Sequence, residues 1–385
     1  MLAASCAHEM RFVPLTRAEV VARLGDDPGL GDLPEDADYQ VLELREQSKL
    51  TVVDRDPTKS IDLASRDVDL LLTRKPLAVV ADKDADTSPA ANPRPMELLL
   101  LLATGQASGQ FEGGNFSGDR LQARPRAGTF GLEVTPDPRV KLTSVKDGVT
   151  ADISIGTPSG RLVYTPSDEP SGAVKVRFEG PTETVILQDG VLATTLHARD
   201  SVAFDIVSAA EDPISELEAV GAVTFDSPAQ NASGHGERLT LKPGKAGAYK
   251  VHLEGALAHA EMREPGKSPR TIDAEVVDLD PAPNELWAWR QVTAVLADLV
   301  KADRGGEPGT LRCEILHVVT LGADDAVEVT ADRDVVFDDP TQNLHAIGDR
   351  LVYTSVLGLA DLDGSPAIVS QLEDATAATG EPTVT

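Results

Sequence analysis

The residue types that carry most metal and enzyme chemistry occur in this sequence without the spacing that such chemistry needs. Asp82, Asp84 and Asp86 alternate as in the first half of a calcium-binding loop. Such a loop needs Gly at its sixth position and a bidentate Glu at its twelfth, and this segment has neither, since Pro93 stands at the twelfth. A solvated acidic loop is therefore the better interpretation.

The rest of the sequence also contains no recognisable catalytic or metal-binding motif. The 7 histidines do not pair at ligand spacing, and Cys6 and Cys313 alone form neither a zinc site nor a disulfide framework. The segment "GNFSG" (114–118) is out of register for a nucleophile elbow, and no phosphate-binding loop occurs. We therefore expect no catalytic residues, no metal and no cofactor. With 63 acidic residues, a polysaccharide-active β-fold enzyme with paired carboxylates stays open as a third alternative.

Composition narrows the function classes further. The 385 residues carry a net charge of −28, which argues against binding nucleic acid phosphates or an anionic membrane surface. Plain acidic solubility is one interpretation, and a partner with a basic patch is the other. Apolar residues make up 41% and aromatic residues only 4%, which suits thin layers of β-strand. The apolar run "MELLLLLATG" (96–105) is too short to span a membrane as a helix.

The N-terminal residues 1–37 read as a lead-in with a short helix. Thr16 is a helix cap, and Val20, Val21 and Leu24 follow at helical spacing. The segment "LAASC" is similar to a lipoprotein cleavage site before Cys6, but only five residues precede that cysteine. We expect this match to be accidental, and no signal peptide is visible.

Strand patterns dominate the remainder of the chain. We predict a first β segment over 38–80, a Pro- and Asp-rich linker or loop over 81–104, and β repeats over 105–283. A helix is predicted for 284–306, a further β repeat for 307–370, and a flexible tail for 371–385.

Two phrases recur through the β repeats. "VTFDSPAQNASGHGERLTL" (223–241) and "VVFDDPTQNLHAIGDRLVY" (335–353) align without a gap. The motif Gly-acid-Arg-Leu recurs around Arg120, Arg238 and Arg350, and it recurs around Arg161 without the acidic residue. It predicts a turn into a strand in each unit. Within these strands apolar and polar residues alternate, so each strand has one buried face and one wet face. Stacked repeats of this kind indicate an array in which each unit buries its face against its neighbours.

The segment "NELWAWRQVTAVLADLVKADRGG" (284–306) interrupts this pattern. Its apolar residues have helical spacing, Asn284 can cap a helix, and Gly305 and Gly306 can end one, so we expect an inserted helix near 284–303. A long strand through "LWAWRQVTAV" is the alternative. Trp287 and Trp289 mark either an interface or the anchor of this element.

The repeated phrases resemble the OstA-like family of lipopolysaccharide transport proteins. "HAIGDRLVYT" (345–354) is the closest match, followed by "GERLTL" (236–241) with "VHLEG" (251–255), and by "SGRLVYT" (159–165) with "VRFEG" (176–180). The resemblance spans about 105–370. The length of the chain and the expected helix depart from the family pattern.

This resemblance implies a fold and a ligand. The expected fold is all-β, a repetitive antiparallel β-jellyroll shaped like a taco, with an apolar interior that conducts lipid acyl chains. It also implies a periplasmic or envelope location and edge-strand pairing with other β-jellyroll transport proteins. Carried over residue by residue, the lining of the lipid groove would be Leu162, Tyr164, Val174, Val176, Phe178, Val223, Phe225, Leu239, Leu241, Val251, Leu253, Val335, Phe337, Leu351 and Tyr353.

The first functional expectation is a non-enzymatic protein that binds lipopolysaccharide or a similar lipid and shields its acyl chains between membranes. The alternative is a structural or adhesive β-solenoid with a closed core that mediates protein contacts. The two differ in whether the apolar face is an open groove or ordinary core.

Overall fold

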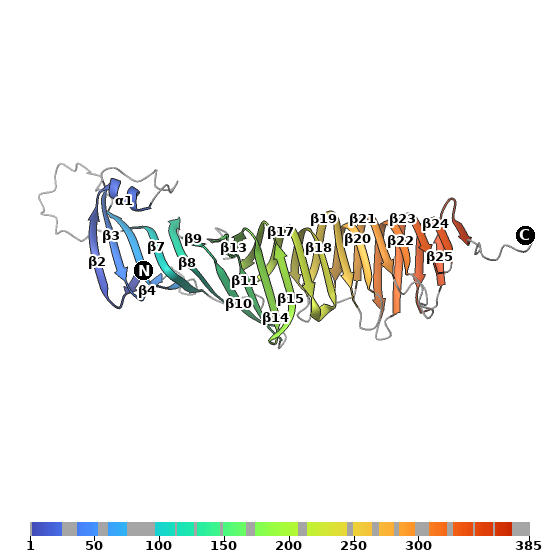
Figure 1. The fold of residues 1–385 in the computed structure, drawn as a ribbon, viewed down its shortest axis with the longest axis horizontal. Helices are drawn as coiled ribbons and strands as arrows, with labels where there is room; N and C mark the ends of the chain where they lie inside the picture. Colours follow the sequence, from blue (N-terminus) through green and yellow to red (C-terminus); the bar gives the residue numbers. More distant parts are fainter. Residues whose placement is uncertain are drawn as a thin grey trace, which may run out of the picture. The chain divides into compact units, whose positions relative to one another are not determined.

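The structure is a computed structural model. It describes residues 2–24, 37–52, 61–74, 97–111, 114–126, 129–146, 149–166, 174–206, 214–244, 249–263, 269–280, 285–296, 308–321, 326–341, 343–356 and 359–371. The fold is all-β, as predicted, with 26 strands in antiparallel pairing (Figure 1). No helix in these ranges is long and apolar enough to cross a membrane.

The chain divides into two compact units, residues 1–142 with 155–179 and residues 143–154 with 180–385. The elements of the first unit are β1 (Leu2–Ser5), β2 (Glu9–Leu15), α1 (Arg17–Leu24), β3 (Asp38–Arg45), β4 (Ser48–Val52), β5 (Ile61–Ser65), β6 (Asp67–Arg74), β7 (Glu97–Phe111), β8 (Gly114–Arg126), β9 (Thr129–Thr135), β12 (Arg161–Pro166) and β13 (Val174–Glu179). The boundary between the units falls within β10 (Arg139–Lys146) and β11 (Val149–Gly156).

The described part of the second unit consists of strands and one short 3₁₀ turn, η3. Its elements are β14 (Thr182–Gln188), β15 (Val191–Ala198), β16 (Ser201–Ile206), β17 (Ile214–Ser227), η3 (Pro228–Gln230), β18 (Ala232–Pro243), β19 (Tyr249–Met262), β20 (Arg270–Asp280), β21 (Glu285–Leu296), β22 (Gly309–Leu321), β23 (Ala326–Asp339), β24 (Leu344–Thr354), β25 (Leu359–Asp363) and β26 (Ile368–Gln371). From β17 to β24 each strand pairs with the next one along the chain.

The N-terminal helix forms where it was expected. The backbone N–H and the hydroxyl of Thr16 both donate to a Glu19 carboxylate oxygen, at 2.8 and 2.9 Å, and the N–H of Glu19 donates back to the Thr16 hydroxyl. This reciprocal pair is a capping box. Val20 of α1 packs against Val41 and Leu100, so α1 covers one face of the first unit's sheet.

This cover explains the apolar run in β7. Leu100 packs under α1, whereas its neighbour Leu101 is fully buried on the other face of the sheet. A strand buried on both faces reads as a continuous apolar run. The strand therefore begins at Glu97, inside the range predicted as linker, whose other residues up to 96 lie outside the described ones.

The helix predicted for 284–306 is wrong over the described residues, because Glu285–Leu296 form the strand β21. This strand pairs with β20 on one side and β22 on the other. Leu286, Ala288, Val292 and Ala294 alternate inward, but Trp287 and Val295 are apolar on the outward face as well. Apolar residues on both faces gave the segment its helical spacing. Residues 297–307 of the predicted helix and 372–385 of the predicted tail lie outside the described residues.

Candidate functional site

The long strands of the second unit each bend near their middle, at a shift in the pairing register. In β17 the shift falls between Val220 and Val223, and in β23 between Asp332 and Val335. Such β-bulges bend a strand and increase its local twist. The bulge divides each long strand into two arms, and the inward face of both arms is apolar.

The recurring Gly-acid-Arg-Leu phrase builds these bends. It was predicted to be a turn between strands, but in β8, β18 and β24 it lies inside one strand. In β24, Gly348 points inward, Asp349 and Arg350 are both exposed, and Leu351 is buried again. Two consecutive outward residues are the signature of a bulge. A Cβ on Gly348 would lie 2.7 Å from the carbonyl oxygen of Asp363, so the bend requires glycine.

The arginines of these bends pair with acids on neighbouring strands of the outer surface. Arg238 lies 3.3 Å from Glu218 and 3.9 Å from Glu254, and Arg350 lies 3.5 Å from Asp332. Exposed ion pairs contribute about 0–1 kcal/mol each. These arginines therefore favour one pairing register between neighbouring strands and contribute little to the free energy of folding.

The other repeated phrase, around Phe-Asp-x-Pro-x-Gln-Asn, forms the hairpins β17–β18 and β23–β24. Phe225 and Phe337 are its inward, buried residues. Asn231 and Asn343 have φ of 50° and 52°, the left-handed conformation that Asn tolerates in turns. The doubled phrase is thus a structural hairpin whose phenylalanine lies on the inward apolar face.

Across β17 to β24 three continuous rows of inward residues have no charged member. One row lies in register over eight strands and consists of Ala219, Leu239, Leu253, Val277, Ala288, Leu316, Ala331 and Leu351. A second row consists of Leu217, Leu241, Val251, Leu279, Leu286, Val318, Val329 and Tyr353, and a third, on the other arm, of Phe225, Gly234, Ala260, Ile272, Ala294, Leu311, Phe337 and Ala346. With strands about 4.8 Å apart, each row extends over about 34 Å.

Within each unit, the structure buries nearly all of the expected groove residues on the inward face of their own strands. Leu162, Val176, Phe178, Val223, Phe225, Leu239, Leu241, Val251, Leu253, Val335, Phe337 and Leu351 are buried, at most 9% exposed. Tyr164 and Tyr353 are half-buried, and the side chain of Val174 lies outside what the structure describes. The two units contribute separately to this set: the residues up to Phe178 belong to the first unit and the others to the second.

Sequence reasoning missed the inward residues of β20, β21 and β22. Val277, Ala288 and Leu316 belong to the same row as Leu239. The signal that could have identified them was the alternation through "LWAWRQVTAV". It was not recognised because the outward tryptophans are apolar as well.

The inward face is covered by the protein itself. The described part of the second unit holds only strands and η3, so no helix is available there to cover the sheet. We infer that the two arms of each strand cover each other across the bulge. Buried charges lie at the hairpin end, where Arg270 and Asp339 are 7% and 1% exposed.

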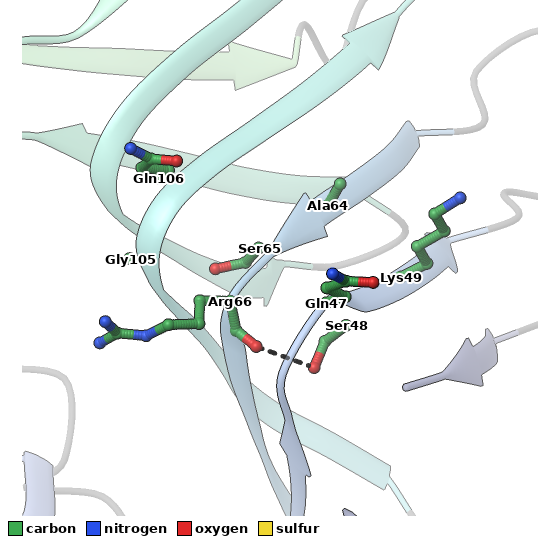
Figure 2. A pocket seen from close by; sticks show the side chains of 8 residues that line it. All are labelled: Gln47, Ser48, Lys49, Ala64, Ser65, Arg66, Gly105 and Gln106. Atoms are coloured by element: carbon green, nitrogen blue, oxygen red, sulfur yellow. Dashed lines mark hydrogen bonds between the residues drawn. The ribbon is translucent and has the colours of Figure 1, made fainter. Parts of the chain in front are cut away.

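The first unit holds a cleft of about 640 Å³ where the chain bends between β3 and β4, between β5 and β6, and within β7 (Figure 2). Gln47, Gln106 and Gly105 line it, with Lys49 and Arg66 extending in opposite directions. Arg66 is committed to Asp67 at 3.0 Å. Because Lys49 and Arg66 extend in opposite directions, they do not form an anion-binding site in this cleft.

Histidines on the outer face of the second unit pair with acids. His252 contacts Asp278 through Nδ1 and lies 3.0 Å from Glu254 through Nε2. Burial lowers the pKa of His252, but the hydrogen bonds with Glu254 and Asp278 and the charges of these acids raise it more, so the net pKa is raised. Among the described residues no three His, Cys, Asp or Glu are grouped so that they could hold a metal ion.

Comparisons of the chain with protein-family models, with curated proteins and with solved structures found no match. The resemblance to the OstA-like family therefore rests on the repeated phrases alone and stays a prediction.

Proposed function

We propose that the chain is a non-enzymatic lipid-binding protein of the bacterial envelope, which shields acyl chains of a lipopolysaccharide-type lipid in its apolar interior. The observation that carries this proposal is the set of uncharged inward rows over eight successive strands. A row of about 34 Å is longer than a single acyl chain. Each methylene moved from water into such an interior contributes about 0.8 kcal/mol.

Acyl chains enter this interior only if the arms of the strands part, because the inward side chains are almost fully buried. Tyr353 is half-buried and faces inward at the C-terminal end of β24, pairing with Val329. It is therefore a point where an entering chain first meets the inward face. The lipid replaces contacts between the arms with contacts of its own, which offsets the cost of parting them.

Partners by edge pairing are part of the same proposal. β24 pairs with β23 on one edge and with the short strands β25 and β26 on the other. Leu359, Ile368 and Val369 of these short strands are 63%, 46% and 64% exposed. Exposed apolar side chains on edge strands favour pairing with a further β-strand, here one from another β-jellyroll transport protein.

The experiment that tests lipid binding uses Tyr353 and its neighbour Val352 as a matched pair. Both are half-buried on the same strand, but they lie on opposite faces of the sheet. The photoreactive residue p-benzoylphenylalanine replaces one or the other in the full chain, and each variant is irradiated with purified lipopolysaccharide. We expect a lipid adduct from position 353, suppressed by excess unlabelled lipopolysaccharide, and little from position 352.

A second candidate is a structural or adhesive β-solenoid with a closed core. The near-complete burial of the inward rows favours it. This candidate predicts no lipid adduct at either position, and equal adducts at both positions would indicate nonspecific adsorption. Either result would contradict the lipid-binding proposal.

A further inference from the structure

The outer face of the second unit carries an apolar patch on three neighbouring strands. One outward row runs across β18 to β24 as Arg238, Glu254, Val276, Trp289, Ile315, Asp332 and Arg350. Its residues on β18, β19, β23 and β24 are charged, whereas those on β20, β21 and β22 are apolar. A change from charged to apolar and back along one wet face is unexpected for a surface that only meets water.

Aromatic rings lie at the centre of this patch. Trp287 stacks on His317 with ring centroids 3.7 Å apart, and Trp289 lies 5.9 Å from Trp287 with planes within 8°. Within the described part of the chain, Trp289 has a ring partner on one side only. Val276, Trp287, Trp289, Ile315 and Val319, all half-buried and outward, are called the tryptophan patch below.

Carboxylates border the tryptophan patch. Asp278 is the cross-strand partner of Trp287, and Glu285 precedes Trp287 by two residues on the same face. Glu285 and Glu328 flank Val319 on either side. Among the residues that the structure describes, neither of these two glutamates has a basic partner. The border is therefore negative, with two carboxylates whose charge is not compensated.

We propose that the tryptophan patch docks a partner protein through an arginine side chain of that partner. A guanidinium group stacks on the face of a tryptophan and forms directed hydrogen bonds to carboxylates, so it fits an aromatic centre beside free glutamates. Tryptophan is also the residue most typical of the centre of a protein interface, where polar neighbours surround it. A net charge of −28 on the whole chain adds long-range attraction for a basic partner.

Intrinsic fluorescence tests this proposal directly, because Trp287 and Trp289 are the 2 tryptophans of the chain. The full chain is titrated with the peptide acetyl-Leu-Arg-Leu-Arg-amide, and in parallel with the same peptide carrying citrulline in place of arginine. Citrulline has nearly the shape of arginine without its charge. We expect a saturable change in tryptophan emission with the arginine peptide, and binding weaker by about tenfold or more with the citrulline peptide.

Two double variants separate the patch from the charge of the whole chain. Glu285→Gln with Glu328→Gln removes two charges beside the tryptophans, and Glu216→Gln with Glu218→Gln removes two from the outward face of β17. Far-UV circular dichroism checks that both remain folded. We expect the first pair to abolish the preference for arginine and the second to leave it within about twofold. Equal binding of both peptides, equal losses in both variants, or no saturable change in emission would overturn the proposal.

Discussion

Replacing Leu239 with alanine tests whether the inward rows are packed core. Leu239 is fully buried in β18 and lies in register between Ala219 and Leu253. The substitution removes three carbon groups, worth about 2.4 kcal/mol at about 0.8 kcal/mol each. The cavity left behind adds to this loss, so we expect unfolding to become easier by about 3 kcal/mol, within the range of about 2–5 kcal/mol for buried leucines.

Urea unfolding followed by tryptophan emission measures this loss, since both tryptophans lie in the same unit as Leu239. The matched control is Thr240→Ala, the next residue on the opposite, half-buried face, for which we expect a change within about 0.5 kcal/mol. A loss below about 1 kcal/mol for Leu239→Ala, or one no larger than the control, would show that the interior is not packed as the burial indicates.

Three further predictions concern two glycines and two titrating groups. Gly234→Ala places a Cβ 2.5 Å from a backbone carbonyl oxygen of the next strand, so we expect it to lower the free energy of unfolding by about 2–3 kcal/mol. Gly190 has nothing within 4 Å, so Gly190→Ala should lower it by about 1 kcal/mol, from the positive φ alone. Similar losses for the two variants in urea titrations would refute this. Because the pKa of His252 is raised in the folded state, its contribution to stability is complete below its ordinary pKa of 6.5 and is lost as the pH rises through the folded value. His252→Gln should therefore make the urea midpoint depend less on pH over this window. An unchanged dependence on pH would contradict the assignment. Burial raises the pKa of the Cys313 thiol to about 12. In the Cys6→Ser variant this thiol should therefore resist alkylation at neutral pH until urea unfolds the protein. Comparable alkylation rates in the folded and unfolded states would argue against its burial.

The fold class and the buried faces could be predicted from alternation alone. Val176 and Phe178 alternate with Lys175 and Arg177, and the structure buries the first pair and exposes the second. The helix at Arg17–Leu24 was also predictable, because the Thr16–Glu19 capping box is local in sequence. These features depend on neighbours within a few residues, which is the range over which a single sequence is informative.

Features set by contacts between distant residues could not be predicted in the same way. The strand β21 reads as a helix because Trp287 and Trp289 face outward, where Trp287 stacks with Trp289 and with His317, 30 residues further along the chain. Arg290 and Gln291 at its bend have φ of 65° and 53°, and nothing in their side chains requires this conformation. The pairing of β21 with both neighbours, rather than its own propensity, decides its structure.

The bulges connect the repeated phrase to the function proposed above. A flat sheet with one apolar face would leave that face in water, and no helix of the described second unit covers it. A bend near the middle of each strand from β17 to β24 lets the apolar face of one arm cover that of the other, so the strand supplies its own partner layer. In β24 the bend needs an inward Gly348, outward Asp349 and Arg350, and a return to the interior at Leu351. In the proposed function, the interior is closed in the free protein and parts for an acyl chain, because the inferred cover is a second arm of the same sheet that is held by one bend per strand. The Leu239→Ala measurement and the lipid adduct at position 353 test these two states separately.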